Sequence, residues 1–275
     1  MLMKNTYNKL FQTRIIILLS VIALSVLTGC RTVPITGRKQ LIMTSVEYEN
    51  GLGATAYGEF KAKFPASTNP QYNDALKNCG NSIAKASGQD DFKWQFTVLD
   101  SEIENAFCLP GGKVAVYTGL MKHMRNEAEL AFVVGHEIGH AIARHGGEKI
   151  THNSLISLGG LIVGLTQGEN AALIYGIGTS LGVALPFSRS NESEADKIGL
   201  ILMARAGYNP KASVQFWTRL TKDKKESKLG TLLSTHPCDS KRIAHMNSLM
   251  TIAEEEYKKC RNKKNFGTVF THDAQ

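Results

Sequence analysis

Two histidines four residues apart, His136 and His140, bracket the stretch of this chain best suited to chemistry, with Glu137 between them. On a helix this spacing places both imidazoles on one face, one turn apart. Two imidazoles in that position can share a zinc ion at about 2.0–2.1 Å each. Glu137 lies beside them, where its carboxylate can hold a water molecule and take its proton. The pattern H-E-x-x-H therefore predicts a hydrolytic zinc site that still needs a third protein ligand.

The residues around this pattern predict a buried helix over 126–145. Asn126 is expected to cap it, with Glu129 reaching back as in a capping box, and the glycines at 146–147 are expected to end it. The motif alone can occur by chance on any helix. Three ionisable groups in an otherwise apolar stretch are rare unless they are paired or bind metal, which favours a site. Gly139 costs up to about 1 kcal/mol in a helix interior, which indicates that another backbone passes close by.

Acidic residues at the start of a second predicted helix, over 188 to about 206, offer the third ligand. Glu192 and Asp196 are four residues apart and share a helix face. Glu194 is rotated by about 200° from Glu192 and points elsewhere. We predict that Glu192 binds the metal and that Asp196 accepts a hydrogen bond from a ligand histidine. The alternative is a solvated acidic helix start, favoured by the helix dipole.

His145 is not assigned to the metal. The three-histidine pattern H-E-x-x-H-x-x-G-x-x-H would need glycine and histidine where this chain has Ala143 and Gly146. His145 is out of register with that pattern. It is therefore expected to be a polar residue at the end of the helix.

The N-terminus predicts export and a lipid anchor. Basic residues precede an apolar stretch, residues 15–27, that is shorter than the about 20 residues of a transmembrane helix. The sequence Leu-Thr-Gly-Cys then ends at Cys30 and resembles a bacterial lipobox, where cleavage is coupled to lipidation of the cysteine. An uncleaved signal anchor, or secretion with a chance cysteine, is the alternative. By this resemblance, Arg31 in place of aspartate directs the mature protein to the periplasmic face of the outer membrane.

We expect a lipoprotein signal peptide over 1–29, a tether over 30–44, one metallopeptidase domain over 45–265 and a tail over 266–275. The formal net charge of +8 is modest. A basic cluster at 258–264 is expected to be a solvated helix end, with contact to anionic lipid as the alternative. Because the export signal takes the protein away from nucleic acid, no nucleic-acid partner is expected.

Four cysteines remain beyond the anchor: Cys79, Cys108, Cys238 and Cys260. In an oxidising periplasm two disulfides with three connectivities are expected, and free buried thiols are the alternative. Residues 239–259 predict one helix whose ends would lie about 30 Å apart, which argues against a bond between Cys238 and Cys260. Since no C-x-x-C spacing occurs, these cysteines are not a metal site.

Helices are also predicted over 45–64 and 69–86, and a half-buried strand over 92–99. Two further strands, 105–109 and 113–118, flank a tight Pro-Gly-Gly turn.

Residues 154–187 contain one charge, Glu169, and break near 166–170 into two apolar pieces, each too short to span a membrane. A buried helical hairpin is expected there. A mobile cover over the cleft, or a surface that touches a membrane or a partner, is the alternative.

The combined motifs resemble the zinc metallopeptidase family that includes the CAAX-prenyl endopeptidases, HtpX and the Oma-type proteases, and most of all its bacterial periplasmic lipoprotein members. The matching segments are Pro34-Ile35-Thr36-Gly37-Arg38, Asn105-Ala106-Phe107, Leu109-Pro110-Gly111-Gly112, Val116-Tyr117-Thr118-Gly119, His136 to His140, Glu192 to Asp196, and His236-Pro237 with Arg242. The resemblance covers nearly the whole mature chain.

The resemblance implies an α+β fold, a mostly helical minigluzincin-like domain with a small mixed β-sheet. It implies that the edge strand of that sheet, at Asn105, Ala106 and Phe107, lines the active-site cleft and binds substrate backbone. It implies that His236 is catalytic, either stabilising the oxyanion or approaching the metal from the far side. Arg242 is expected to be structural.

We therefore expect one Zn²⁺ per chain, held by His136, His140 and Glu192, with Glu137 as general base. The expected activity is that of a lipid-anchored zinc endopeptidase. Strand addition at the cleft favours unfolded or loosely folded segments. The resemblance implies unfolded or misassembled envelope proteins as substrates, and assembly machinery as a possible partner. The alternative function is a periplasmic chaperone or assembly factor whose zinc site is latent.

Overall fold

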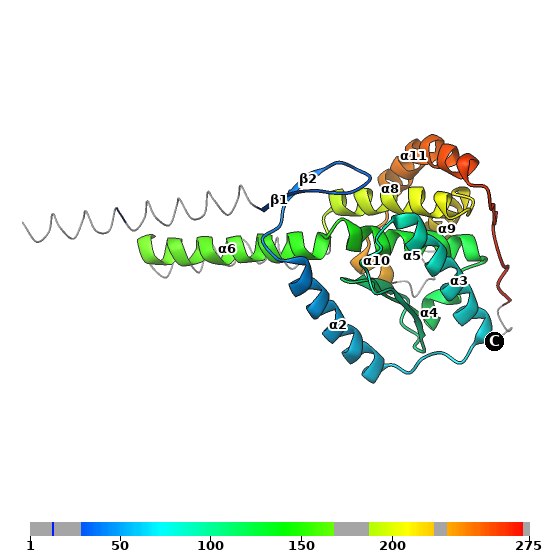
Figure 1. Cartoon of the computed structure of the whole chain (residues 1–275), viewed down its shortest axis with the longest axis horizontal. Helices are drawn as coiled ribbons and strands as arrows, with labels where there is room; N and C mark the ends of the chain where they lie inside the picture. Colours follow the sequence, from blue (N-terminus) through cyan, green and yellow to red (C-terminus); the bar gives the residue numbers. More distant parts are fainter. Residues whose placement is uncertain (1–12, 14–28, 168–186, 223–229, 272–275) are drawn as a thin grey trace, which may run out of the picture.

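The structure, a computed structural model, describes residues 13, 29–167, 187–222 and 230–271 (Figure 1). The predicted signal peptide, apart from residues 13 and 29, lies outside the described residues. The strands are β1 Cys30–Thr32, β2 Lys39–Leu41, β3 Gln95–Leu99, β4 Ala106–Leu109 and β5 Lys113–Tyr117. The helices are α2 Val46–Lys63, α3 Pro70–Ser87, α4 Thr118–Met121, α5 Glu127–Ile142, α6 His145–Gln167, α8 Arg189–Arg205, α9 Lys211–Lys222, α10 Gly230–Thr235 and α11 Ser240–Lys259.

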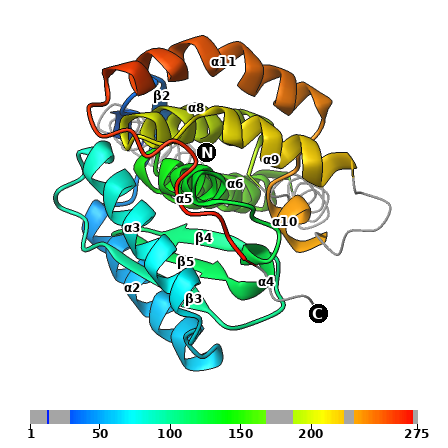
Figure 2. The same cartoon turned by 90° about the vertical axis from the view of Figure 1, so that its right-hand side faces the viewer.

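Helices dominate around one small mixed sheet, which confirms the predicted α+β class. The sheet, α5, α8 and α11 follow one another from bottom to top in Figure 2, and each contacts the next. Every residue of α5 is buried. This helix is therefore held in place from the sheet side and from the α8 side at once.

Glycines allow α5 and α8 to approach closely. A Cβ atom added at Gly199 would lie 2.8 Å from the backbone nitrogen of His136, and one at Gly139 would lie 3.0 Å from the carbonyl oxygen of Ala195. The contact at Gly199 leaves no room for a side chain, and the one at Gly139 is tighter than most Cβ contacts in proteins, so glycine at both positions allows the close packing. The backbone contact predicted from Gly139 is confirmed. The close approach brings the carboxylates of α8 within reach of the histidines of α5.

The start of α5 follows the prediction in part. The side chain of Asn126 accepts a hydrogen bond from the backbone N–H of Glu129 at 3.1 Å, as expected of a cap. The carboxylate of Glu129 accepts from the backbone N–H of Arg125 at 2.8 Å rather than from that of Asn126. It also pairs with Arg219 at 2.6 Å. The reciprocal bond of a capping box is thus replaced by an ion pair.

The end of α5 differs from the prediction. The helix stops at Ile142, and Arg144 makes the break in a left-handed conformation with φ of 54°. Two contacts hold this residue there: its guanidinium pairs with Glu49 at 2.7 Å and donates to the carbonyl of Thr44 at 2.9 Å. The glycines at 146–147 lie instead in the first turn of α6. The helix therefore ends three residues earlier than the glycines suggest.

The three-stranded sheet has the order β3-β5-β4. Central strand β5 is parallel to β3 and antiparallel to β4, with Ala106 opposite Val116. The predicted hairpin is confirmed, and its turn glycines Gly111 and Gly112 have φ values of 78° and 81°. Within the described chain β4 pairs on one side only, with β5, and it packs against α5.

Residues 30–44, expected to be a tether, instead begin with an antiparallel hairpin of β1 and β2. The hairpin contacts the start of α6 (Figure 1). Its turn residue Arg38 pairs with Glu148 and Glu194, each at 2.7 Å. These ion pairs dock the segment on the domain.

Helix α6 extends away from the body in Figure 1. Residues 152–158 are all partly or fully exposed, so the expected burial of the apolar segment is wrong for its described start. The backbone N–H of Met43, just after the hairpin, donates a hydrogen bond to Thr151 of α6 at 2.9 Å. Residues 168–186 lie outside the described part of the chain. Among the described helices, none combines the length and apolar character needed to cross a bilayer.

All five cysteines are described, and each is a free thiol, so the expected disulfides are absent. The alternative of free buried thiols holds for Cys79 and Cys238, whereas Cys108 and Cys260 are half-buried. Cys79 is fully buried in α3, where it packs in the main core. Cys238 and Cys260 lie at opposite ends of α11, as the helix length predicted.

Candidate metal centre

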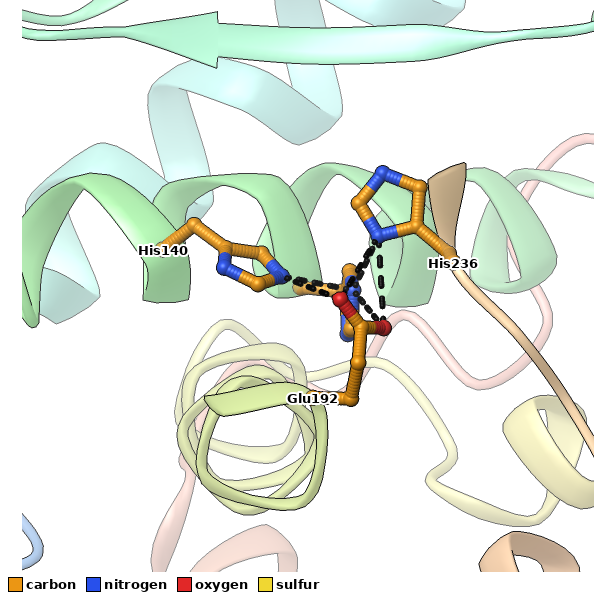
Figure 3. Close-up of side chains that lie close together, drawn as sticks. His140, Glu192 and His236 are labelled. Atoms are coloured by element: carbon orange, nitrogen blue, oxygen red, sulfur yellow. Dashed lines mark hydrogen bonds and ion pairs between the residues drawn. The ribbon is translucent and has the colours of Figure 1, made fainter. Parts of the chain in front are cut away.

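Four buried side chains converge at one point beside α5. His136 and His140 come from α5, Glu192 from the first turn of α8, and His236 from the segment after α10. One ligand atom of each lies within 4.8 Å of those of the others. Figure 3 shows His140, Glu192 and His236 pointing toward one another.

Five of the six distances between the ligand atoms of this cluster match a tetrahedral zinc site, and all six lie within 4.8 Å. Nε2 of His136 lies 3.1 Å from Nε2 of His140 and 3.2 Å from Nδ1 of His236. The carboxylate oxygens of Glu192 lie 3.2–3.4 Å from the same three nitrogens. Ligands at 2.0–2.1 Å from a tetrahedral ion are separated by about 3.3 Å. Imidazole and carboxylate are also donors that suit zinc, so the residues present fit the ion.

His136 contacts Asp196 on the side of its ring that faces away from the cluster. Its Nδ1 atom lies 2.9 Å from the carboxylate of Asp196, which is fully buried. Arg242 donates to Asp196 at 2.6 Å, pairs with Glu192 at 2.8 Å, and stacks over the ring of Trp217. Burial raises the pKa of Asp196, but Arg242 and His136 lower it to about 2.

Sequence reasoning missed how His140 is held. His145, expected to be a polar helix end, is 1% exposed, and its Nδ1 atom lies 2.8 Å from Nδ1 of His140. Glu194 does point away from the cluster, as its rotation on the helix predicted. It lies instead 3.0 Å from Nε2 of His145. Because the helix breaks at Arg144, His145, the first residue of α6, lies against His140. The glycines at 146–147 had predicted a later helix end, so this contact was not expected.

A cleft of about 510 Å³ opens beside the cluster. It is lined on one side by residues 105–110 of β4 and its flanks and on the other by Glu137, His140 and His236. Glu137 is 4% exposed, and its carboxylate lies 3.4 Å from Nε2 of His236. Burial raises the pKa of Glu137, which makes it a stronger base. Phe187, which the sequence did not single out, stacks on His140 with ring centres 4.4 Å apart.

The sequence of this chain is similar to those of known metallopeptidases. Peptidase family M48 matches residues 70–250, a range that includes the whole cluster. Mitochondrial metalloendopeptidase OMA1 from Schizosaccharomyces pombe is 33% identical over 233 residues, covering 82% of this chain and 68% of that protein. OMA1 from Arabidopsis thaliana is 43% identical over 166 residues, covering 60% and 33%. The beta-barrel assembly-enhancing protease from Yersinia pestis is 27% identical over 212 residues, covering 73% and 43%. The chain thus spans between one third and about two thirds of the length of these relatives.

Proposed function

Because the chain belongs to Peptidase family M48, a family of zinc metallopeptidases, we propose that it is an endopeptidase of the bacterial cell envelope that cleaves unfolded or misassembled proteins. The observation that carries this proposal is the cluster of three histidines and Glu192 next to a buried glutamate in an open cleft. The relatives named as metalloendopeptidases, and the one named as a beta-barrel assembly-enhancing protease, support cleavage at internal bonds and a role in protein quality control.

The chain's own residues divide the reaction between them. When bound, zinc polarises the scissile carbonyl and lowers the pKa of water toward about 7. Glu137 takes the proton of the attacking water and later delivers it to the leaving amine. His236 points its Nε2 atom toward Glu137 and its Nδ1 atom toward Glu192 at 3.2 Å. From there it would stabilise the oxyanion of the substrate during the reaction.

Substrate binding is proposed at the free edge of β4. Asn105, Ala106 and Phe107 line the cleft, and the backbone of β4 has a strand partner on one side only within the described chain. An extended peptide can add to this edge as a further strand. Folded proteins rarely offer an extended segment, so this mode of binding selects unfolded regions.

Metal removal tests the proposal. The purified protein is expected to contain one zinc per chain and to cleave an unfolded protein at internal bonds. A chelator should abolish cleavage, and added zinc should restore it. The same substrate in its folded state is the control and should stay intact. Cleavage that persists without metal, or suppression of aggregation without any cleavage, would instead support a chaperone with a latent site.

We further propose that a lipid on Cys30 anchors the protein at the periplasmic face of the outer membrane. Cys30 is exposed and begins β1, so a lipid there would hold the docked hairpin close to the membrane. Partners in assembly machinery would then bind at the periplasmic face of the outer membrane.

Changing Cys30 to alanine tests this location. The variant should lack the mass of a lipid and should leave the outer-membrane fraction, because the anchor is lost. Fractionation and intact mass of both proteins decide the matter. An unchanged mass and an unchanged membrane fraction would rule out the anchor.

A further inference from the structure

A line of buried polar contacts leads from His140 to the N-terminal hairpin. Nδ1 of His140 lies 2.8 Å from Nδ1 of His145, and Nε2 of His145 lies 3.0 Å from Oε2 of Glu194. Arg38 donates to that same oxygen at 2.7 Å, and Thr36 donates to the other oxygen of Glu194. His145 is 1% exposed and Glu194 is 8% exposed, so little water competes for these contacts.

The donors and acceptors in this line can be assigned from their chemistry. An ionised carboxylate only accepts hydrogen bonds, so His145 carries its hydrogen on Nε2, facing Glu194. The Nδ1 atoms of His140 and His145 face each other, so one of them must accept, and with its hydrogen on Nε2 His145 presents the lone pair of Nδ1. His140 must therefore donate from its own Nδ1. Its Nε2 atom is left with a free lone pair, and that atom is the one that faces Glu192 and His136.

We propose that His145 is a positioning residue for His140, and that Glu194 and Arg38 hold His145 in the orientation and tautomer that keep Nε2 of His140 free for metal. This inference rests on His140 being a metal ligand, as proposed above. Histidine ligands commonly donate their second N–H to a fixed acceptor, which sets the ring orientation and raises affinity. Here the acceptor is a second histidine rather than a carboxylate.

The two ligand histidines of α5 are thus held by matching arrangements. His136 is held by Asp196, which pairs with Arg242 from α11. His140 is held through His145 by Glu194, which pairs with Arg38. In each case a buried carboxylate is fixed by an arginine from a distant part of the chain. The second arginine belongs to the hairpin that begins at Cys30, so the hairpin takes part in building the metal site.

Two substitutions at His145 separate hydrogen bonding from packing. His145→Phe keeps a ring of similar size but has no acceptor for His140. His145→Asn leaves a gap but keeps an oxygen close to the position of Nδ1. The phenylalanine variant is expected to bind zinc about 10–100-fold more weakly than wild type. The zinc affinity of the asparagine variant should lie between those of wild type and the phenylalanine variant. Zinc affinity is measured by competition with a chromophoric chelator. If packing alone mattered, the order of the two variants would be reversed.

Arg38→Met tests the outer end of the line. Zinc affinity should fall by a smaller factor than in His145→Phe, because Glu194 keeps its bond to His145. Arg189→Met is the matched control, since Arg189 forms an exposed ion pair with Asp239 at 2.7 Å. This control should leave the affinity unchanged. Equal affinities for Arg38→Met and wild type would remove the hairpin from the proposal.

The tautomers themselves are measurable without any assay of activity. In zinc-loaded wild-type protein with ¹⁵N-labelled histidine, long-range ¹H–¹⁵N spectra should show hydrogen on Nδ1 of His140 and on Nε2 of His145. Hydrogen on Nδ1 of His145 would overturn the assignment. If wild type binds no zinc, the proposed function itself fails. If wild type binds zinc and the His145 variants bind it equally well, only this inference fails.

Discussion

Changing Glu137 to glutamine is expected to lower the rate of cleavage of an unfolded protein by at least about 10²–10⁴-fold while zinc content stays the same. Glutamine has the same shape and can still accept a hydrogen bond, but it cannot take a proton from water. The glutamate is not among the four residues that could hold the ion, so its loss should leave the metal in place. Turnover and zinc content of the same purified sample are the two measurements.

Glu104→Gln is a matched control for this result. Glu104 is also buried, at 7% exposure, but it pairs with His123 at 2.8 Å and does not line the cleft. Its neutral variant should cleave at a rate close to that of wild type. Near-normal cleavage by Glu137→Gln would remove the assigned base, and loss of zinc from that variant would show that Glu137 acts on the metal instead.

Local signals predicted most of the elements that carry the site. The caps Ser45, Asn69 and Asn126 each accept a hydrogen bond from a backbone N–H in the first turn of α2, α3 and α5, where the sequence placed helix starts. Spacing by four residues also predicted that Glu192 and Asp196 would share a face of α8. Such signals reach only a few residues along the chain, so they can be read from sequence alone.

The parts that could not be predicted depend on distant partners. Arg38 pairs with Glu148 and Glu194, which are 110 and 156 residues away, so nothing near Arg38 marks the hairpin as docked. The turn at Arg144 is held by Glu49, 95 residues earlier. Because nothing near residue 144 signals that turn, the sequence predicts His145 only as a polar residue at the end of the helix. A composition rule that ends helices at glycine fails where a distant ion pair stabilises a left-handed arginine.

Changing Glu192 to alanine is expected to weaken zinc binding more than any change at Asp196 or Glu194. A structural zinc with four ligands is bound by about 10–16 kcal/mol, so one ligand corresponds to about 2.5–4 kcal/mol, or about 10²–10³-fold in affinity. Removing this carboxylate also leaves the guanidinium of Arg242, which pairs with it at 2.8 Å, next to the ion. Like charges at short range in a buried site add to the loss.

Because His236 is a further possible ligand, the loss of Glu192 should reduce zinc affinity rather than abolish binding. After loss of Glu192, three histidines remain within reach of the ion, so zinc should bind weakly rather than not at all. Combining Glu192→Ala with His236→Ala leaves two histidines and should abolish stable binding. This double variant therefore measures how much of the remaining affinity His236 provides.

Comparison among the three acidic residues of α8 decides the ligand assignment. Asp196→Asn should cost about 10–100-fold in zinc affinity, because Asp196 acts on the metal only through His136. Glu194→Ala should cost less than Glu192→Ala, since two imidazoles separate Glu194 from the ion. The half-buried Glu256 of α11, which pairs with Arg205 and Lys259 at 2.6 Å each, gives a control variant that should bind as wild type does. Zinc affinities of these variants are compared by competition with one chelator. If Glu194→Ala loses zinc while Glu192→Ala retains it, the ligand lies on the other face of α8, and the tetrahedral arrangement read from the interatomic distances is wrong.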